Sequence, residues 1–187
     1  KKNKYSINKN LSLLLMTSGS TGDPNTVRIS NENIMSNTDS ITKNLKIKSK
    51  DIAITTLPMN YSLGMSIINT HLHKGATIVL NKHSFFEKKF WDILKIKKVT
   101  TFTGVPFNYE ILFKMGIDKK KLPYIKYLTQ AGGKLDQKLT NFFNNKLSEL
   151  KIKFYIMYGQ TEASPRMSYL NHKDISKHQE SIGKPLK

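Results

Sequence analysis

The sequence predicts an α/β fold, a doubly wound and mostly parallel sheet with helices on both faces. Short apolar runs, typical of buried strands, alternate with longer segments in which apolar residues recur at helical spacing. This strand–helix alternation is typical of a parallel sheet covered by helices. The length of 187 residues suits one domain, or most of one, with a sizeable core.

The first half of the chain begins with an apolar run at residues 11–16, bounded by Asn10 and by Ser18-Gly19, which predicts a buried strand. A helix follows at residues 31–45, where Ile34, Thr38, Ile41 and Leu45 lie at helical spacing. The remaining segments of this half are expected as a strand at 51–57, a helix at 64–73 and a strand at 76–80.

The second half continues the same rhythm. Residues 85–97 place Phe86, Phe90, Ile93 and Ile96 on one helical stripe. Asp136 marks the start of a later helix. The other elements expected are strands at 99–103, 125–129 and 152–157 and helices at 107–115 and 136–150.

The formal charge of +18 raises the question of a nucleic-acid partner. Only Arg28 and Arg166 are arginines, and arginine is the residue favoured for bidentate contacts with phosphate and guanine. The lysines are spread along the chain among many asparagines, which indicates a solvated surface. We therefore expect no specific nucleic-acid partner, and keep a basic nucleic-acid binder as a minor alternative.

Composition also limits the chemistry and the location. The chain has no cysteine, which excludes a disulfide framework and thiol catalysis. We expect no membrane span and no signal peptide, and hence a cytoplasmic location. The chain starts at Lys1 without methionine and stops in a turn-like segment at Gly183, so we interpret it as a piece of a longer protein.

In a doubly wound sheet, ligands bind in the loops at the carboxyl ends of the strands. The first such loop combines glycines, which let the backbone approach a ligand closely, with hydroxyl groups. Backbone amides and hydroxyls together can surround a polyphosphate. The alternative is a flexible linker, and no Gly-Lys-Ser/Thr of a Walker loop is present. The candidate phosphate-binding residues are Thr17, Ser18, Gly19, Ser20, Thr21 and Gly22.

Two further loops follow later strands. Gly132 and Gly133, followed by Lys134, can let a flat base lie against the backbone, or can simply form a tight turn. In the last loop, which contains Gly159 and Gln160, Tyr158 can stack on a base or belong to the core. There Thr161 can reach a phosphate, and Glu162 can hold Mg²⁺ or be a surface carboxylate.

With these loops in this order, the sequence resembles the adenylate-forming superfamily: acyl-CoA synthetases, peptide-synthetase adenylation domains, D-alanine–carrier-protein ligases and luciferases. The resemblance runs from about Leu13 to Pro185. Its most specific segments are LLLMTSGSTGDP, LPMNYSLGMSIINTHLHKGATIVL, TFTGVPFNYEIL, LTQAGGKL, YGQTEAS and SIGKP. It implies that residues 1–187 are part of the large N-terminal AMP-binding domain.

The resemblance also implies a role for each loop. Residues 17–22 would hold the β- and γ-phosphates of ATP, and Thr17 and Glu162 would support Mg²⁺. Gly132, Gly133 and Lys134 would line one side of the adenine and Tyr158 the other, with Gly159 and Gln160 beside them and Thr161 at the α-phosphate. The residues implied near the carboxylate substrate are Asn60, Tyr61, Gly64, Gly104 and Val105.

The implied function is activation of a carboxylic acid, acyl or aminoacyl, as an acyl-adenylate, with CoA or a phosphopantetheine carrier protein as the acceptor. We expect these 187 residues alone to bind nucleotide weakly and to have little or no full activity. Two positions differ from the family pattern: Asn25 stands where lysine is usual, and Asn60-Tyr61 where many members have histidine. Asn25 supports an alternative, a catalytically degenerate nucleotide-binding module with a structural or regulatory role.

Overall fold

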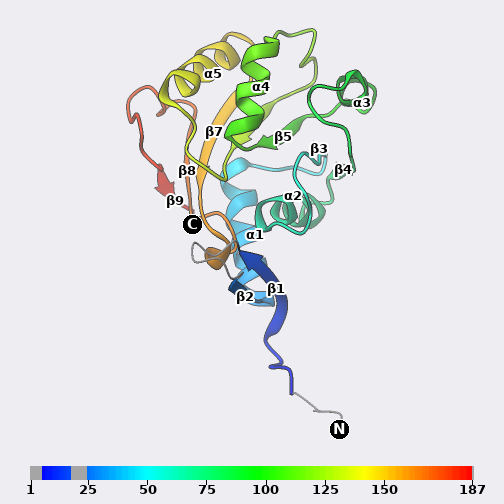
Figure 1. Ribbon diagram of the computed structural model, residues 1–187, viewed down its shortest axis with the longest axis vertical. Helices are drawn as coiled ribbons and strands as arrows, with labels where there is room; N and C mark the ends of the chain where they lie inside the picture. The colour runs from blue at the N-terminus through cyan, green and yellow to red at the C-terminus, as the bar shows by residue number, and fades with distance from the viewer. Residues whose placement is uncertain (1–5, 18–24, 187) are drawn as a thin grey trace.

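The computed structural model describes residues 6–17 and 25–186, and it confirms the predicted α/β class. Seven strands form the main sheet in the order β4-β3-β5-β6-β7-β8-β9 (Figure 1). The first five are parallel to one another, and the last two are antiparallel additions at one edge. Their bounds are β3 Ile52–Ile54, β4 Thr77–Val79, β5 Thr101–Gly104, β6 Tyr127–Gln130, β7 Lys153–Tyr158, β8 Ser168–Leu170 and β9 Lys184–Pro185.

Helices cover both faces of this sheet because successive strand residues point to opposite sides. Leu128 and Phe154 face the larger core, which α3 Lys88–Ile96, α4 Pro106–Met115 and α5 Gln137–Glu149 complete. Tyr127 and Tyr155 face a smaller core with α1 Asn31–Leu45, and α2 Ser62–His73 packs beside α1. Across the described residues, no helix is both long and apolar enough to cross a membrane.

The connections reverse direction at β3. From β3 the chain passes through α2 to β4 on one side, and it then crosses back to β5 on the other side of β3. Loops that leave in opposite directions open a crevice at the carboxyl ends of the strands, where doubly wound proteins bind ligands. The loop at residues 55–61 and the turn at Gly104 and Val105 lie at this point.

The expectation of a buried strand at residues 11–16 is wrong in its placement. The segment is a strand, β1 Leu11–Thr17, but it pairs antiparallel with an unexpected strand, β2 Asn25–Ser30, in a separate two-stranded sheet (Figure 1). Only Leu15 of β1 is fully buried, whereas Leu14 is 54% and Met16 63% exposed. A continuous apolar run is typical of a strand covered on both faces, but this strand is covered on one face only.

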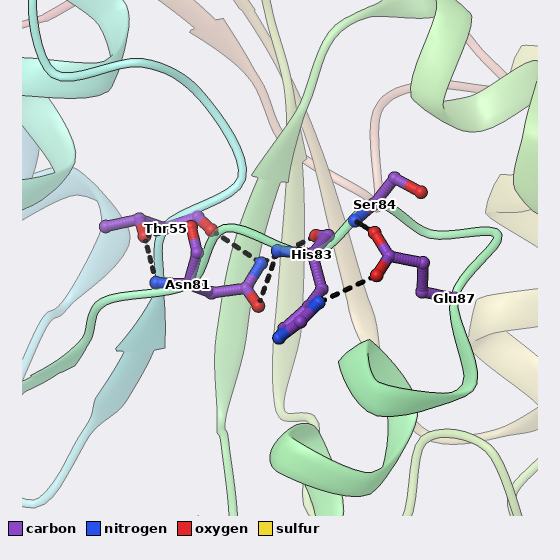
Figure 2. A network of polar contacts seen from close by, with 5 residues as sticks. All are labelled: Thr55, Asn81, His83, Ser84 and Glu87. Atoms are coloured by element: carbon purple, nitrogen blue, oxygen red, sulfur yellow. Dashed lines mark hydrogen bonds and ion pairs between the residues drawn. The ribbon is translucent and has the colours of Figure 1, made fainter.

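The helix expected at residues 85–97 begins later, at Lys88. Two members of the predicted stripe, Phe86 and Ile96, are 66% and 74% exposed, whereas Phe85 is buried against Phe90 at a ring separation of 4.6 Å. A polar network fixes the turn before this start: the Glu87 carboxylate accepts from the Ser84 amide at 2.7 Å and lies 2.7 Å from His83 Nδ1 (Figure 2).

The same network joins the ends of two neighbouring strands. The Asn81 backbone N–H donates to Thr55 Oγ1 at 2.9 Å, and the Asn81 side-chain Nδ2 donates to the His83 carbonyl at 2.8 Å (Figure 2). The network thereby ties the segment after β4 to the end of β3 and fixes the edge of the crevice. Because each of these polar groups has a partner within the network, we interpret it as structural.

Candidate functional site

A cavity of about 510 Å³ lies at the carboxyl ends of β6 and β7. These two strands are adjacent and parallel, so their following loops emerge side by side. The cavity brings together two loops that the sequence singled out, with Gly132, Gly133 and Lys134 on one and Tyr158 and Gly159 on the other. Its volume falls in the range of pockets that bind small molecules and cofactors. Residues 178–182 add a wall that sequence reasoning missed.

The glycine loop is held tightly against its neighbours. Gly132 has φ +76°, and a Cβ on it would lie 3.1 Å from Val105 Cγ1, so this position favours glycine. Gln130, at the buried end of β6, donates from Nε2 to the Gly133 carbonyl at 2.8 Å. The loop is therefore a tight turn that borders the cavity, and its role as a platform for a base stays a prediction. Gln130 is also a residue that sequence reasoning missed; a polar residue ending a buried strand was its signal.

Tyr158 ends β7 and is 44% exposed, whereas its neighbour Met157 is buried in the smaller core. Strand alternation thus turns the Tyr158 side chain away from the smaller core, and Tyr158 lines the cavity. On the opposite loop, Lys134 Nζ lies 3.0 Å from Glu180 Oε1. Both side chains are well exposed, so this ion pair contributes little to stability but connects the glycine loop to the missed wall.

The turn after β7 is fixed by its backbone. A Cβ on Gly159 would lie 1.8 Å from the Pro165 carbonyl oxygen, so the chain closes on itself here. Thr161 then opens a short 3-10 turn, Thr161–Ala163, and its Oγ1 lies 3.1 Å from Ser62 Oγ at the start of α2. That contact links the last loop to the switch point. The described lining of the large cavity includes neither Gln160 nor Thr161.

The residues expected near a carboxylate substrate lie around the switch point. Gly64 packs on the backbone of Pro58, and a Cβ on Gly104 would lie 2.9 Å from Tyr109 Cε2. Val105 borders the glycine loop, because its Cγ1 would lie 3.1 Å from a Cβ on Gly132. Asn60 and Tyr61 are exposed at the same edge of the sheet.

Of the expected phosphate-binding residues, Ser18, Gly19, Ser20, Thr21 and Gly22 lie outside the described residues. Thr17 ends β1, where its Oγ1 lies 3.5 Å from the Asn25 carbonyl. Strand β2 contacts the turn that carries Glu162, so the hairpin and the last loop are neighbours (Figure 1). Glu162 is exposed, and within the described residues its carboxylate has no hydrogen bond or ion pair, which leaves hard oxygen donors of the kind Mg²⁺ prefers.

The fold and the cavity together define a doubly wound α/β domain with a cavity at the carboxyl edge of its sheet, where this class of fold binds ligands. The chain belongs to the AMP-binding enzyme family, whose model matches residues 3–187.

Its relatives include the D-alanine–D-alanyl carrier protein ligase of Bacillus licheniformis, 26% identical over 81% of this chain and 30% of the relative. A mitochondrial medium-chain acyl-CoA ligase of Mus musculus is 28% identical over 90% of this chain and 28% of the relative. The chain thus spans less than a third of the length of these relatives.

Among solved structures, o-succinylbenzoate CoA synthetase from Bacillus subtilis with a product analogue matches with a TM-score of 0.82 and 24% identity, over 94% of this chain and 35% of that one. The same enzyme in complex with ATP and magnesium matches with a TM-score of 0.80, over 92% of this chain and 35% of that one. This likeness supports the fold described above.

Proposed function

We propose that the protein containing this domain activates a carboxylic acid with ATP, forming an acyl-adenylate and pyrophosphate. One observation carries the proposal: Gly132, Gly133, Lys134 and Tyr158 border one cavity of about 510 Å³ at the carboxyl edge of the sheet. Membership of the AMP-binding enzyme family supports the same conclusion.

In the proposed reaction, a carboxylate oxygen attacks the α-phosphorus, and the bond from that phosphorus to the bridging oxygen of the β-phosphate breaks. The pyrophosphate leaves with the electron pair. Such a displacement needs positioning and charge stabilisation rather than a protein nucleophile. The glycine loop and Tyr158 would clamp the base, Thr161 would donate to the α-phosphate, and residues 17–22 would hold the outer phosphates.

We infer that two oxygen-bearing side chains support a divalent cation. The exposed carboxylate of Glu162 and the hydroxyl of Thr17 would hold Mg²⁺, which would neutralise phosphate charge. The carboxylic acid would lie between Asn60, Tyr61 and Gly64 on one loop and Gly104 and Val105 on the other. The carrier-protein ligase and the acyl-CoA ligase among the relatives support two acceptors for the acyl group, a phosphopantetheine carrier thiol and CoA.

The test is ATP–pyrophosphate exchange by the full-length protein against amino, hydroxy and fatty acids. We expect exchange with at least one class, and a loss of about 100-fold or more in Glu162→Gln, which keeps the shape but removes the charge. Glu149→Gln, on the exposed end of α5, serves as the control and should exchange at the wild-type rate. No exchange with any acid, despite measurable nucleotide binding, would contradict adenylation.

That outcome would favour a second function, a nucleotide-binding module without catalysis. Asn25 supports it, because the usual lysine would supply a positive charge beside the outgoing pyrophosphate. Asn25→Lys distinguishes the two functions: a large gain in exchange indicates a weakened enzyme, and no gain in an inactive protein indicates a binding module.

A further inference from the structure

Arg166 is a buried cation for which the described residues provide no carboxylate. Its side chain is 3% exposed, and no ion pair within 4.0 Å involves it in the described part of the chain. Its Nη1 contacts the Met157 sulfur at 3.1 Å, and its Nε has no hydrogen-bond partner among the same residues. Burial lowers the pKa of Arg166 to about 10, so the guanidinium stays charged near neutral pH. A buried charge is ordinarily paired, because leaving water costs several kcal/mol per ion.

Two more buried polar atoms border the same small cavity. His71 Nε2 and Tyr127 Oη lack hydrogen-bond partners within residues 6–17 and 25–186, and both residues line this cavity with Arg166. The His71 tautomer follows from its other nitrogen, which lies 2.8 Å from the Ile67 carbonyl and therefore carries the proton. Asp51 is the acidic residue whose negative charge acts electrostatically on Tyr127 and His71. Its carboxylate already accepts from Lys126 Nζ and from the Lys48 backbone amide, each at 2.8 Å.

The cavity lies directly beneath the switch point. Its wall includes Thr103, one residue before Gly104, and Ile67, one helical turn after Gly64. Thr103 and Thr129, at the ends of β5 and β6, add hydroxyls joined at 2.7 Å. The volume is about 10 Å³, about that needed for one water molecule, so a larger group must widen the cavity as it enters.

We propose that Arg166 receives a second anionic group of the carboxylic acid, so that the preferred substrates carry a negative charge at the end remote from the activated carboxylate. This inference rests on the proposed adenylation. The end group would enter between α2 and the sheet and accept from Arg166 Nε and Tyr127 Oη. Two charges in a low-dielectric interior interact strongly, so an acid lacking this group would leave the guanidinium unpaired.

The test measures pyrophosphate exchange by the full-length protein with pairs of acids of equal length: butanoate with succinate, and hexanoate with adipate. We expect kcat/KM to favour the diacid by about tenfold or more. Arg166→Met should lower that ratio by at least about tenfold, and Tyr127→Phe, which removes a single oxygen, by about threefold. Lys95→Met removes an exposed positive charge on α3 and should leave the ratio unchanged.

A wild-type preference for the monoacids, or an unchanged ratio in both cavity variants, would overturn the inference while leaving adenylation in place. Exchange with no acid at all would overturn adenylation and this inference together. If Arg166→Met does not fold, as judged by its thermal transition, the Tyr127→Phe ratio decides alone.

Discussion

At the scale of single residues, close backbone approach shapes the substrate edge of the sheet. Gly64 lies in the first turn of α2 against Pro58, and a Cβ there would lie 2.1 Å from the Pro58 carbonyl oxygen. No rotamer relieves such a clash, because the oxygen belongs to the backbone and a Cβ has a fixed position. The glycine therefore sets how closely the loop after β3 packs on α2.

We predict that Gly64→Ala lowers the free energy of unfolding by about 3 kcal/mol, since the loop or the helix must shift. Gly116→Ala is the matched control. Gly116 has φ +67°, and no described atom lies within 4 Å of the position that a Cβ would occupy. This variant should therefore lose only about 1 kcal/mol, the cost of placing alanine in a left-handed backbone conformation. Urea unfolding measures both. Equal losses in the two variants would contradict the close approach.

The buried histidine makes stability depend on pH. Burial, and secondarily the nearby Arg166 charge, lowers the pKa of His71 below its usual value of 6.5. Below pH 6.5 the unfolded chain therefore binds more protons than the folded chain, and the free energy of unfolding falls as the pH falls. Burial also lowers the pKa of His172, which adds to the same trend.

We predict that His71→Asn, which retains a donor for the Ile67 carbonyl but does not titrate, shows a shallower loss of stability between about pH 6.5 and 5. Urea unfolding across this range measures the slope, and His178→Asn, at an exposed position, should keep the wild-type slope. An unchanged slope in His71→Asn would show that His71 titrates alike in both states.

At the scale of elements, α1 and α5 begin where a side chain accepts from free backbone amides. Asp136 accepts from the amides of Lys138 at 2.8 Å and Leu139 at 3.4 Å, which fixes the start of α5. Ser30 starts α1 in a reciprocal arrangement with Asn33. Because α5 follows the glycine loop directly, its start also limits the loop's freedom at the cavity.

We predict that Asp136→Ala lowers the free energy of unfolding by about 1 kcal/mol, whereas Asp136→Asn, which retains the cap, loses less than half of that. Urea unfolding measures the difference, and it is compared between variants whose denaturant m-values are equal. If both variants lose the same amount, the charge rather than the hydrogen bonds is responsible.

At the scale of the whole molecule, the charge of +18 is carried on the surface by scattered lysines. One of the two arginines, Arg166, is buried and cannot contact a nucleic acid without unfolding its surroundings. The remaining basic groups attract polyanions through sequence-independent forces that salt screens.

We predict that this protein binds a random DNA duplex at about 0.05 M salt and releases it by about 0.2 M salt, with no preference among duplexes. Fluorescence anisotropy at increasing salt measures this. Retention at physiological salt with a preferred sequence would restore the nucleic-acid alternative.

The sequence by itself determined the alternation of strands and helices and the order of the loops, because both depend on local periodicity and on glycine and proline positions. It also pointed to Gly132, Gly133, Lys134 and Tyr158, since each follows a recognisable strand. Hydrophobicity alone misplaced two elements: β1 pairs outside the main sheet, and Phe86 and Ile96 lie exposed.

Only the tertiary structure decided which residues meet across the chain. The parallel pairing of β5 with β6 places Thr103 and Thr129 beside one another, and both line the small cavity with His71, Tyr127 and Arg166. Local patterns carry no record of such contacts, because they join residues tens of positions apart. From the sequence, Arg166 is indistinguishable from the other basic residues of the surface. The structure buries it beneath the proposed substrate site, where no carboxylate among the described residues pairs with it.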